Sequence, residues 1–170
     1  VKAAKLGDAA VLKALIKILS ENNVKVIRLN TFNPELTLKK GVFTRIKPSK
    51  EDKDQILKGI KTLKKINSHN HTQAVIIRDN KVICVEKRNG TKEMIKRVPK
   101  SKIKNGILIK LPKAKQDLRV DLPTIGIDTF KDCNITGIKG IVVKSKQNII
   151  LDKEISIKYA NRNKLFLVAI

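Results

Sequence analysis

Short runs rich in β-branched residues alternate along the chain with amphipathic helical patterns, and this alternation restricts the fold more than any other feature. The clearest apolar run is "GILIKL", Gly106 to Leu111, whose length is typical of a strand buried on both faces. Between such runs, apolar residues recur with helical spacing, as in the segment from Asp8 to Leu19. Strands that alternate with helices predict a single α/β domain, in which helices flank a layered, mixed or largely parallel sheet.

Local signals identify several of the elements. Ser49 and Asp52 have the spacing of a capping box and predict the start of a helix. Asp79-Asn80, between two apolar runs, predicts a hairpin turn. "VKVIRL", Val24 to Leu29, alternates and is rich in β-branched residues, so it predicts a further strand.

The chain is strongly basic, with 38 Lys and Arg against 15 Asp and Glu and a formal net charge of +23. Such a charge attracts polyanions, among them nucleic acid, an acidic membrane face and phosphorylated substrates. The lysines are scattered, and one Tyr, four Phe and no Trp offer few side chains that could stack on bases. Nucleic acid is therefore not the expected partner. The lysines of the helix after Ser49 are expected to form a solvated face: Lys53, Lys58, Lys61, Lys64 and Lys65.

The remaining global features are typical of a cytoplasmic protein. No run of about eighteen apolar residues occurs, and the first residues lack the apolar core of a signal peptide. Cys84 and Cys133 match no metal-ligand spacing and are expected to be reduced, mostly buried thiols. His69 and His71 resemble a metal-binding pair in spacing alone, so a solvated loop is the simpler interpretation.

Acidic residues gather in one segment of this basic chain, "KQDLRVDLPTIGIDT" from Lys115 to Thr129. In an extended chain Asp117, Arg119 and Asp121 would point to one face, because they are spaced two apart. They could form a neutralised surface ladder, or the carboxylates could hold a divalent cation while Arg119 binds a phosphate. The segment joins a buried strand to a helix, at the kind of sheet edge where α/β domains usually bind ligands.

Donor groups for an anion flank this segment. Lys110 and Lys113 precede it, and Thr124 and Gly126 follow it beside a helix predicted to start near Asp128.

A second cluster of polar residues, Glu86, Gly90 and Thr91, lies where another strand turns into a helix. Gly90 permits close backbone approach. The simpler interpretation of Thr91 is that it caps the helix.

Three segments together resemble the carboxyl-terminal part of the LpxI-type UDP-2,3-diacylglucosamine pyrophosphatases. They are the opening "GDAAVLKALIKILSENNVKVI", then "GTKEMIKR" and "LIKLPKAKQDLRVDLPTIGIDT". The specific element is Q-D-x-R-x-D-x-P-T-x-G, from Gln116 to Gly126, and the resemblance runs from about Gly7 to the last residue. Family members carry a further amino-terminal domain. Residues 1–170 are therefore expected to be the carboxyl-terminal catalytic and lipid-substrate domain of a larger protein.

The resemblance implies a bacterial enzyme of lipid A biosynthesis. Such enzymes use a divalent cation, typically Mg²⁺, to hydrolyse UDP-2,3-diacylglucosamine to UMP and 2,3-diacylglucosamine 1-phosphate (lipid X). The family holds its ligand between two domains, which implies the amino-terminal domain as a partner and an inactive isolated chain. Peripheral contact with the inner membrane and a homo-oligomer are further hypotheses about partners.

The acidic motif of the family matches Asp121 and Asp117, which the resemblance implies as metal-binding and catalytic residues, with Arg119 acting beside them. The candidate substrate-binding residues are Lys110, Lys113, Gln116, Thr124, Gly126, Gly90 and Thr91.

Two departures from the family pattern bear on activity. Where the family usually reads E-G-T-D, this chain has Asn89 and Lys92 in place of the two acids, and K-P-G-Q-D is K-A-K-Q-D here. The lost negative charges favour weaker cation binding. Two alternatives to an active enzyme therefore stay open: a non-catalytic basic module that binds nucleic acid or anionic lipid, and a structural remnant that has lost catalysis.

Overall fold

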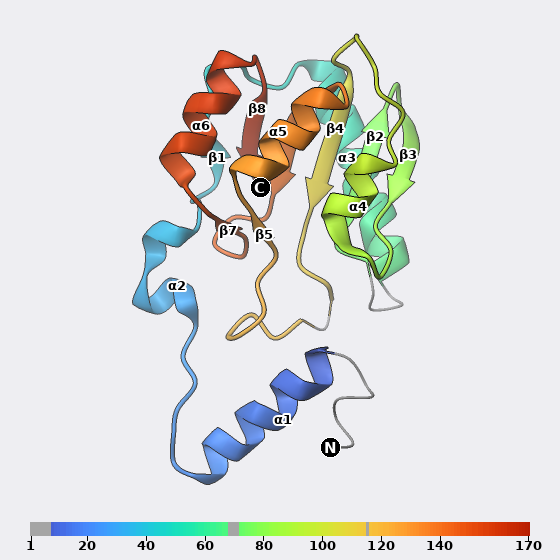
Figure 1. Ribbon diagram of the computed structural model, residues 1–170. Coiled ribbons are helices and arrows are strands. Elements are labelled where there is room, and N and C mark those ends of the chain that lie inside the picture. The colour runs from blue at the N-terminus through green and yellow to red at the C-terminus, as the bar shows by residue number, and fades with distance from the viewer. Residues whose placement is uncertain (1–7, 68–71, 115) are drawn as a thin grey trace.

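The computed structural model describes residues 8–67, 72–114 and 116–170 (Figure 1). His69 and His71, with their predicted solvated loop, lie outside these described residues. The helices are α1 (Asp8–Glu21), α2 (Leu29–Phe32), the short 3₁₀ helix η2 (Pro34–Leu36), α3 (Lys50–Asn67), α4 (Gly90–Lys96), α5 (Ile127–Ile135) and α6 (Lys153–Arg162). The strands are β1 (Gly41–Val42), β2 (Ala74–Arg78), β3 (Lys81–Val85), β4 (Gly106–Lys110), β5 (Thr124–Ile125), β6 (Ile138–Val143), β7 (Ile149–Ile150) and β8 (Phe166–Ala169).

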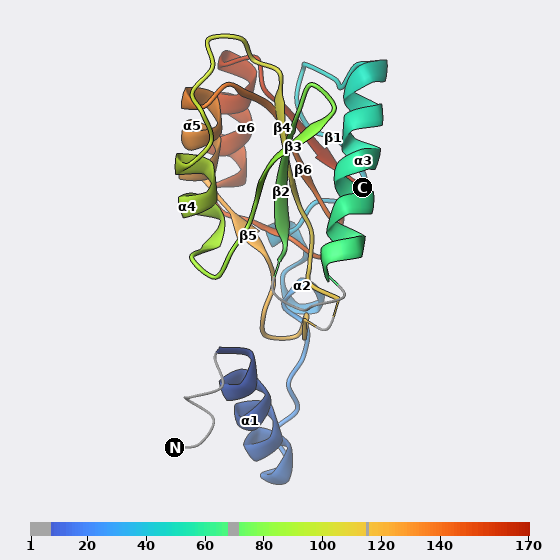
Figure 2. The ribbon, with the colours of Figure 1, turned by 90° about the vertical axis from the view of Figure 1, so that its right-hand side faces the viewer.

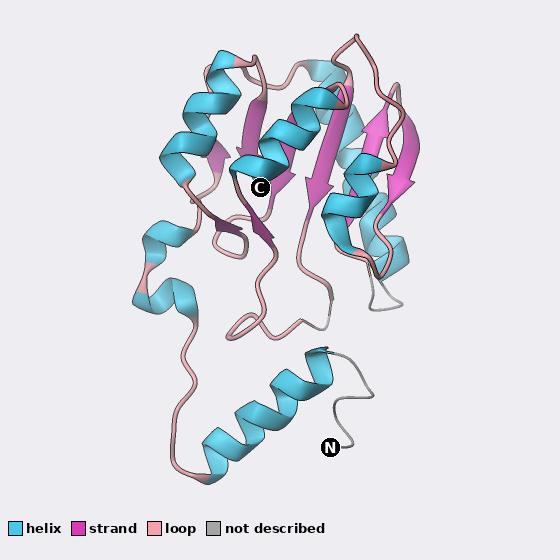
Figure 3. Ribbon diagram, in the orientation of Figure 1, coloured by secondary structure: helices cyan, strands magenta, loops and turns pink. Residues whose placement is uncertain are grey.

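Six of the strands form one mixed sheet in the order β1-β8-β6-β4-β2-β3 (Figure 3). The central strands β4, β6 and β8 are parallel. The outer strands β1, β2 and β3 are antiparallel to their neighbours. β5 and β7 form a separate pair of short parallel strands. The predicted α/β domain with a mixed sheet is therefore confirmed.

Helices cover both faces of the sheet, with α3 on one side and α4, α5 and α6 on the other, as Figure 2 shows. The side chains of β4 alternate between these two layers. Ile107 and Ile109 pack in one buried cluster with Leu63 of α3. Leu108 packs in the other cluster with Phe130 of α5. Because alternate residues of a strand share a face, the last residue of β4 points, like Leu108, to the layer of α4, α5 and α6.

The local signals for the helix and the hairpin are confirmed. The Ser49 N–H donates to Asp52 Oδ2 at 3.0 Å and the Asp52 N–H donates to Ser49 Oγ at 3.2 Å, which is a reciprocal capping box. Asp79 and Asn80 have φ angles of 48° and 59°, as a two-residue hairpin turn between β2 and β3 requires. The predicted solvated face of α3 is exposed in the structure: Lys53, Lys58, Lys61, Lys64 and Lys65.

α1 lies apart from the sheet, beyond the edge at which β4, β6 and β8 end (Figure 1). The helix ends because Asn23 adopts a left-handed conformation with φ 59°. The Val24 N–H then donates to Leu19 O at 2.8 Å, which satisfies a carbonyl group of the last turn.

The predicted strand from Val24 to Leu29 is wrong. Residues 24–28 form no regular element, and Leu29 begins the helix α2 instead. Val24 and Ile27 are 50% and 49% exposed, so the alternating pattern has no buried face to pack against. The segment also has no neighbouring strand with which its backbone could form a ladder of hydrogen bonds.

The two cysteines agree with their prediction as unpaired thiols. Cys84 is partly buried and Cys133 is buried, and neither forms a disulfide. Burial raises the pKa of the Cys133 thiol well above its ordinary value, so this side chain is an unreactive part of the core. In the described part of the chain, no helix combines the length and the apolar composition that a bilayer crossing requires.

Candidate functional site

A buried chain of polar side chains lies at the carboxyl end of β4. Lys110, the last residue of β4, is 7% exposed, and its Nζ donates a hydrogen bond to Thr91 Oγ1 at 2.8 Å. The Thr91 hydroxyl donates in turn to Glu86 Oε1 at 2.5 Å. Glu86 directly follows β3 and is 3% exposed. An ammonium group, a hydroxyl group and a carboxylate from three different segments are thus connected in series.

Backbone and side-chain amide groups fix both ends of this series of hydrogen-bonded side chains. The Gln73 N–H donates to Glu86 Oε2 at 2.9 Å, so both carboxylate oxygens of Glu86 are bonded. At the other end, Asn148 is 1% exposed, and its Nδ2 donates to the carbonyl oxygen of Lys110 at 3.2 Å. The Lys144 N–H donates to Asn148 Oδ1 at 2.9 Å. The ends of β4 and β6 are therefore held together beside the buried lysine.

The charge of Lys110 depends on its surroundings. Burial lowers the pKa of the Lys110 ammonium, because it removes the water that would stabilise the charged form. Glu86 raises this pKa and Lys113 lowers it. The acidic residue therefore acts to keep the buried amine protonated.

Thr91 has a different role from the predicted helix cap. α4 begins at Gly90 after Asn89, and Thr91 lies inside its first turn with its hydroxyl committed to Glu86 and Lys110. The φ of Gly90, +81°, favours glycine. Among the described residues, apart from its chain neighbours, no atom lies within 4 Å of where a Cβ would stand, so the close backbone approach that Gly90 permits is not present there.

The acidic motif is a turn, so the prediction that its charged residues share one face of an extended chain is wrong. The N–H groups of Val120 and Asp121 donate to Asp117 O at 3.2 and 2.9 Å, which closes one helical turn. Asp117 Oδ1 accepts the Arg119 N–H at 3.1 Å. An aspartate that bonds the backbone two residues further along stabilises a turn in competition with a strand, which explains the difference.

Asp117 and Arg119 form a bidentate ion pair. Arg119 Nε donates to Asp117 Oδ1 at 3.0 Å, and Arg119 Nη2 donates to Oδ2 at 2.7 Å. These bonds to the guanidinium hold the pKa of Asp117 at about 2. The Asp121 carboxylate is partly buried and has no hydrogen-bond or ion-pair partner among the described residues. Of the two predicted metal-binding carboxylates, only that of Asp117 is therefore paired within the described part of the chain.

The loop between β4 and this turn is closed by a predicted site residue. Gln116 Oε1 accepts the Lys113 N–H at 2.9 Å, and the Gln116 N–H donates to Lys113 O at 3.1 Å. Lys113 and Gln116 are thereby brought together immediately after the buried Lys110. The side chain of Gln116 is used to shape the loop.

The predicted site residues that line a surface hollow are divided between two separate hollows. One, of about 490 Å³, lies between α1 and the acidic turn, and it is lined by Lys13, Ile16, Lys17, Ser20, Glu21, Asp117 and Arg119. The other, of about 260 Å³, contains Thr124 and Gly126 at the start of α5, and it shares no lining residue with the first. Thr124 and Gly126 are therefore not brought into the hollow of Asp117 and Arg119.

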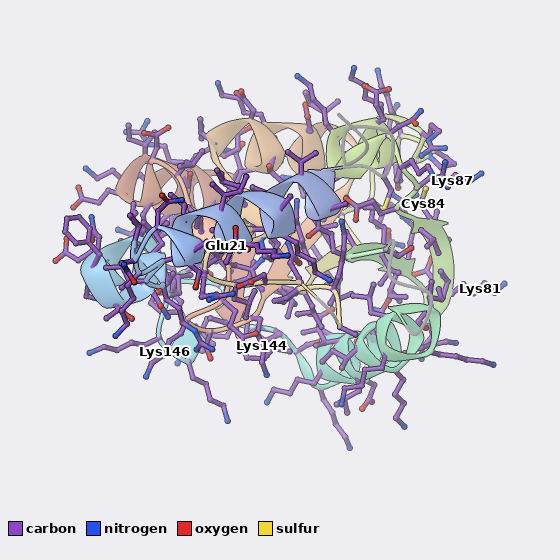
Figure 4. The ribbon with its side chains drawn as sticks, turned by 90° about the horizontal axis from the view of Figure 1, so that it is seen from below. Glu21, Lys81, Cys84, Lys87, Lys144 and Lys146 are labelled. Carbon is purple, nitrogen blue, oxygen red and sulfur yellow. The ribbon has the colours of Figure 1, made fainter. Side chains whose placement is uncertain are left out.

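Figure 4 views the molecule from this end, with α1 and its Glu21 toward the viewer. Lys144 and Lys146, which follow β6, lie on one side of α1, whereas Lys81 and Lys87 lie at the far margin beside β3. Lys144 follows the carboxyl end of β6, whereas Lys81 pairs with Arg78, which pairs with Gly106 at the amino end of β4, so Lys81 belongs to the opposite end of the sheet.

The residues present fit one type of cation site. In the described part of the chain, no three His, Cys, Asp or Glu side chains gather into a metal-binding group. Mg²⁺, however, is usually bound through one or two carboxylates together with waters and the phosphates of a substrate. Asp121 and Asp117, joined across one turn, could supply such a pair.

Sequence reasoning underestimated Glu86 and missed Asn148. The sequence places Glu86 in a cluster of polar residues with Gly90 and Thr91, but the resemblance assigns it no role. The available signal was an acidic residue at a strand end in a very basic chain. Asn148 gave no signal, because its partners Lys110 and Lys144 are brought to it only by the pairing of β4 with β6.

Comparisons with known proteins add to this geometry. Residues 39–168 match the family described as the LpxI C-terminal domain. The chain is also similar to the UDP-2,3-diacylglucosamine pyrophosphatase LpxI of Caulobacter vibrioides, with 28% identity over 176 residues. That alignment covers 99% of the chain and 63% of the relative. The chain thus spans less than two-thirds of the length of the curated relative that it matches.

Proposed function

The chain belongs to the LpxI C-terminal domain family, and on this basis we propose that it contributes to the hydrolysis of UDP-2,3-diacylglucosamine in lipid A biosynthesis. The reaction breaks the pyrophosphate bond with water and releases UMP and lipid X. The observation that carries the proposal is the family match over residues 39–168, since this range contains every candidate site residue. We place the reaction in the cytoplasm, with peripheral contact at the inner membrane where a diacylated substrate is found.

The basic residues of the site are proposed to bind the pyrophosphate. Attack of water on phosphorus increases negative charge on the phosphate oxygens, and fixed cationic donors stabilise that charge. Lys110 offers a buried ammonium group beside the loop that carries Lys113. Arg119 offers a planar guanidinium, which matches two oxygens of a phosphate.

The acidic residues are proposed to hold a divalent cation, Mg²⁺ by preference. When bound, such an ion neutralises phosphate oxygens and orients the attacking water. Asp121 is the first ligand, because its carboxylate has no partner among the described residues. Asp117 is the second, because Arg119 occupies both of its oxygens. A phosphate that binds Arg119 competes with Asp117 for the guanidinium and so releases the carboxylate.

The departures at Asn89 and Lys92 are proposed to weaken cation binding without disturbing the buried hydrogen bonds that connect Lys110, Thr91 and Glu86. Both side chains are exposed, on either side of the Gly90-Thr91 pair. The bonds of Thr91 to Glu86 and Lys110 do not involve them. We therefore expect an enzyme with a raised requirement for Mg²⁺ rather than an inert remnant.

The greater length of the relative supports the proposal that a further, amino-terminal domain completes the site. The test is to incubate the full-length protein with UDP-2,3-diacylglucosamine and Mg²⁺ and to measure UMP. We expect UMP release that a chelator abolishes, and no release from the 170-residue chain alone. Asp121→Ala should abolish turnover, whereas Asp54→Ala, which removes an exposed carboxylate of α3, should not. Metal-dependent turnover that survives in Asp121→Ala would remove the assignment of Asp121.

One observation favours a second candidate, a non-catalytic module that binds polyanions: α3 presents a continuous row of exposed lysines. Nucleic-acid binding through such a surface should weaken steeply as salt rises from low to physiological concentration, because each phosphate contact releases counterions. Binding of an RNA oligonucleotide that is strong at low salt and falls steeply toward physiological salt, together with no UMP release by the full-length protein, would favour this candidate over the hydrolase.

A further inference from the structure

We infer that Glu86 is a positioning residue for this site: acting through the Thr91 hydroxyl, its carboxylate fixes the Lys110 ammonium group in a place where it can bind a phosphate of the substrate. The inference rests on the proposed function, because it takes a pyrophosphate group as the ligand of Lys110. Glu86 itself is assigned no contact with the substrate, because both of its carboxylate oxygens are already bonded, one to the Thr91 hydroxyl and one to the Gln73 N–H.

The hydrogen bonds impose a direction on the three groups. A threonine hydroxyl has one proton to donate and two lone pairs that accept. Because that proton is donated to Glu86 Oε1, a lone pair of Thr91 Oγ1 is left to accept from Lys110 Nζ. The carboxylate of Glu86 is held in turn by the Gln73 N–H. Glu86 therefore determines the orientation of the hydroxyl, and the hydroxyl determines the position of the ammonium.

The arrangement leaves part of the ammonium group unused. An ammonium group has three protons to donate, and Thr91 is the only acceptor for Lys110 Nζ found among the described residues. A carboxylate bonded directly to Lys110 would neutralise the amine at contact distance. With a hydroxyl between them, Glu86 compensates the buried charge from a greater distance, and the remaining protons stay available to an anion.

The charged groups that act on Lys110 oppose one another. Glu86, after β3, favours the protonated amine, whereas Lys113, in the loop after β4, disfavours it. Burial also disfavours it. If the carboxylate is removed, both remaining influences act against the charge. The amine should then lose its proton at a lower pH and with it its attraction for a phosphate.

A purely structural role would not require charged side chains at these buried positions. A buried ion pair can often be replaced by packed apolar side chains without loss of stability. Glu86, Thr91 and Lys110 instead lie at the carboxyl edge of β4, next to the acidic turn, where ligands of α/β sheets usually bind. The placement of a buried charge at this edge indicates a use in ligand binding.

The first experiment measures Lys110 without any ligand. In the full-length protein, the lysine side-chain signals are followed by NMR as pH is raised, and Lys110 is assigned by its absence in Lys110→Met. We expect a lower titration midpoint for Lys110 in both Glu86→Gln and Thr91→Val, and a midpoint close to that of the wild type in Thr91→Ser, which keeps the hydroxyl. A midpoint that does not change in Glu86→Gln and Thr91→Val would overturn the inference.

The second experiment measures the binding of inorganic pyrophosphate by calorimetry from about pH 6 to about pH 9. At the upper end, Glu86→Gln should bind about tenfold more weakly than the wild type, with a smaller deficit at the lower end, where the amine regains its proton. Asp52→Asn is the matched control, because it removes another buried carboxylate, the partner of Lys139 at 2.7 Å, far from this edge. It should leave the Kd within about twofold of the wild type, because it touches none of the three groups.

The two experiments distinguish a failure of the inference about Glu86 from a failure of the proposed function. An equal, pH-independent loss of pyrophosphate binding in Glu86→Gln and Asp52→Asn would show that Glu86 acts only through stability, and would overturn the inference. Failure of the wild-type full-length protein to bind pyrophosphate would instead overturn the proposed function, while the titration of Lys110 would still test the link from Glu86 to the amine.

Discussion

Replacement of Arg119 by glutamine should raise the pKa of Asp117 from about 2 almost to the 3.8 of an ordinary aspartate. The two hydrogen bonds from the guanidinium, at 3.0 and 2.7 Å, are lost in this variant, and they are the first cause of the low pKa. The bond from the backbone N–H of residue 119 to Asp117 Oδ1, at 3.1 Å, remains. That backbone bond lowers the pKa of Asp117 whereas desolvation by burial raises it, so the new midpoint should lie close to 3.8.

The assay is an NMR titration of the aspartate carboxyl carbons. Lys131→Gln, which removes the lysine paired with Asp128 at 3.6 Å, is the matched control and should leave Asp117 at about 2. The reasoning is refuted if the midpoint of Asp117 also stays at about 2 in Arg119→Gln.

The same ion pair predicts how the free energy of unfolding changes with pH, including the direction of the change. The folded-state pKa of Asp117 is depressed relative to the unfolded value of about 3.9. Pairing therefore stabilises the fold above about pH 4, and the contribution is lost as pH falls through about 2. The difference in the free energy of unfolding between wild type and Arg119→Gln should be constant above this window and should shrink within it. A difference that grows as pH falls would have the wrong sign.

Three further substitutions test the packing that supports the site, each by urea unfolding. Asp52→Ala removes the buried partner of Lys139 and the capping box of α3. It should lower the free energy of unfolding by about 3 kcal/mol, and a loss below about 1 kcal/mol would contradict this expectation. Gly140→Ala places a Cβ that would overlap the buried ring of Phe166. It should lower the free energy of unfolding by about 3 kcal/mol or prevent folding, and an unchanged free energy would show that the ring can move aside. Gly90→Ala should cost only about 1 kcal/mol, because φ is +81° but the space is open; a much larger loss would mean that this space is filled.

Features that depend on a few neighbouring residues were predictable from the sequence. The reciprocal bonds of Ser49 and Asp52 and the turn at Asp79-Asn80 follow from side-chain chemistry and backbone conformations that need no distant partner. The apolar run from Gly106 to Leu111 also predicts the buried strand β4, Gly106–Lys110, because a strand buried on both faces must be apolar almost throughout.

Features that depend on tertiary partners were not predictable in the same way. The segment from Val24 to Leu29 has a strand pattern but no strand beside it. In the acidic motif, the Asp117 side chain competes for backbone N–H groups, and periodicity does not reveal this. Thr91 has the sequence context of a cap, yet the approach of Glu86 and Lys110 from other strands gives its hydroxyl a different role.

The most direct test of the account is where pyrophosphate and Mg²⁺ bind on the full-length protein, measured by the shifts of backbone amide signals in NMR. We expect the shifted amides to cluster in residues 86–91 and 110–121, around the end of β4 and the acidic turn. We also expect Asp121→Asn to remove the part of the response that requires Mg²⁺. Shifts that follow the exposed lysines of α3, with residues 86–91 and 110–121 unaffected, would contradict the account.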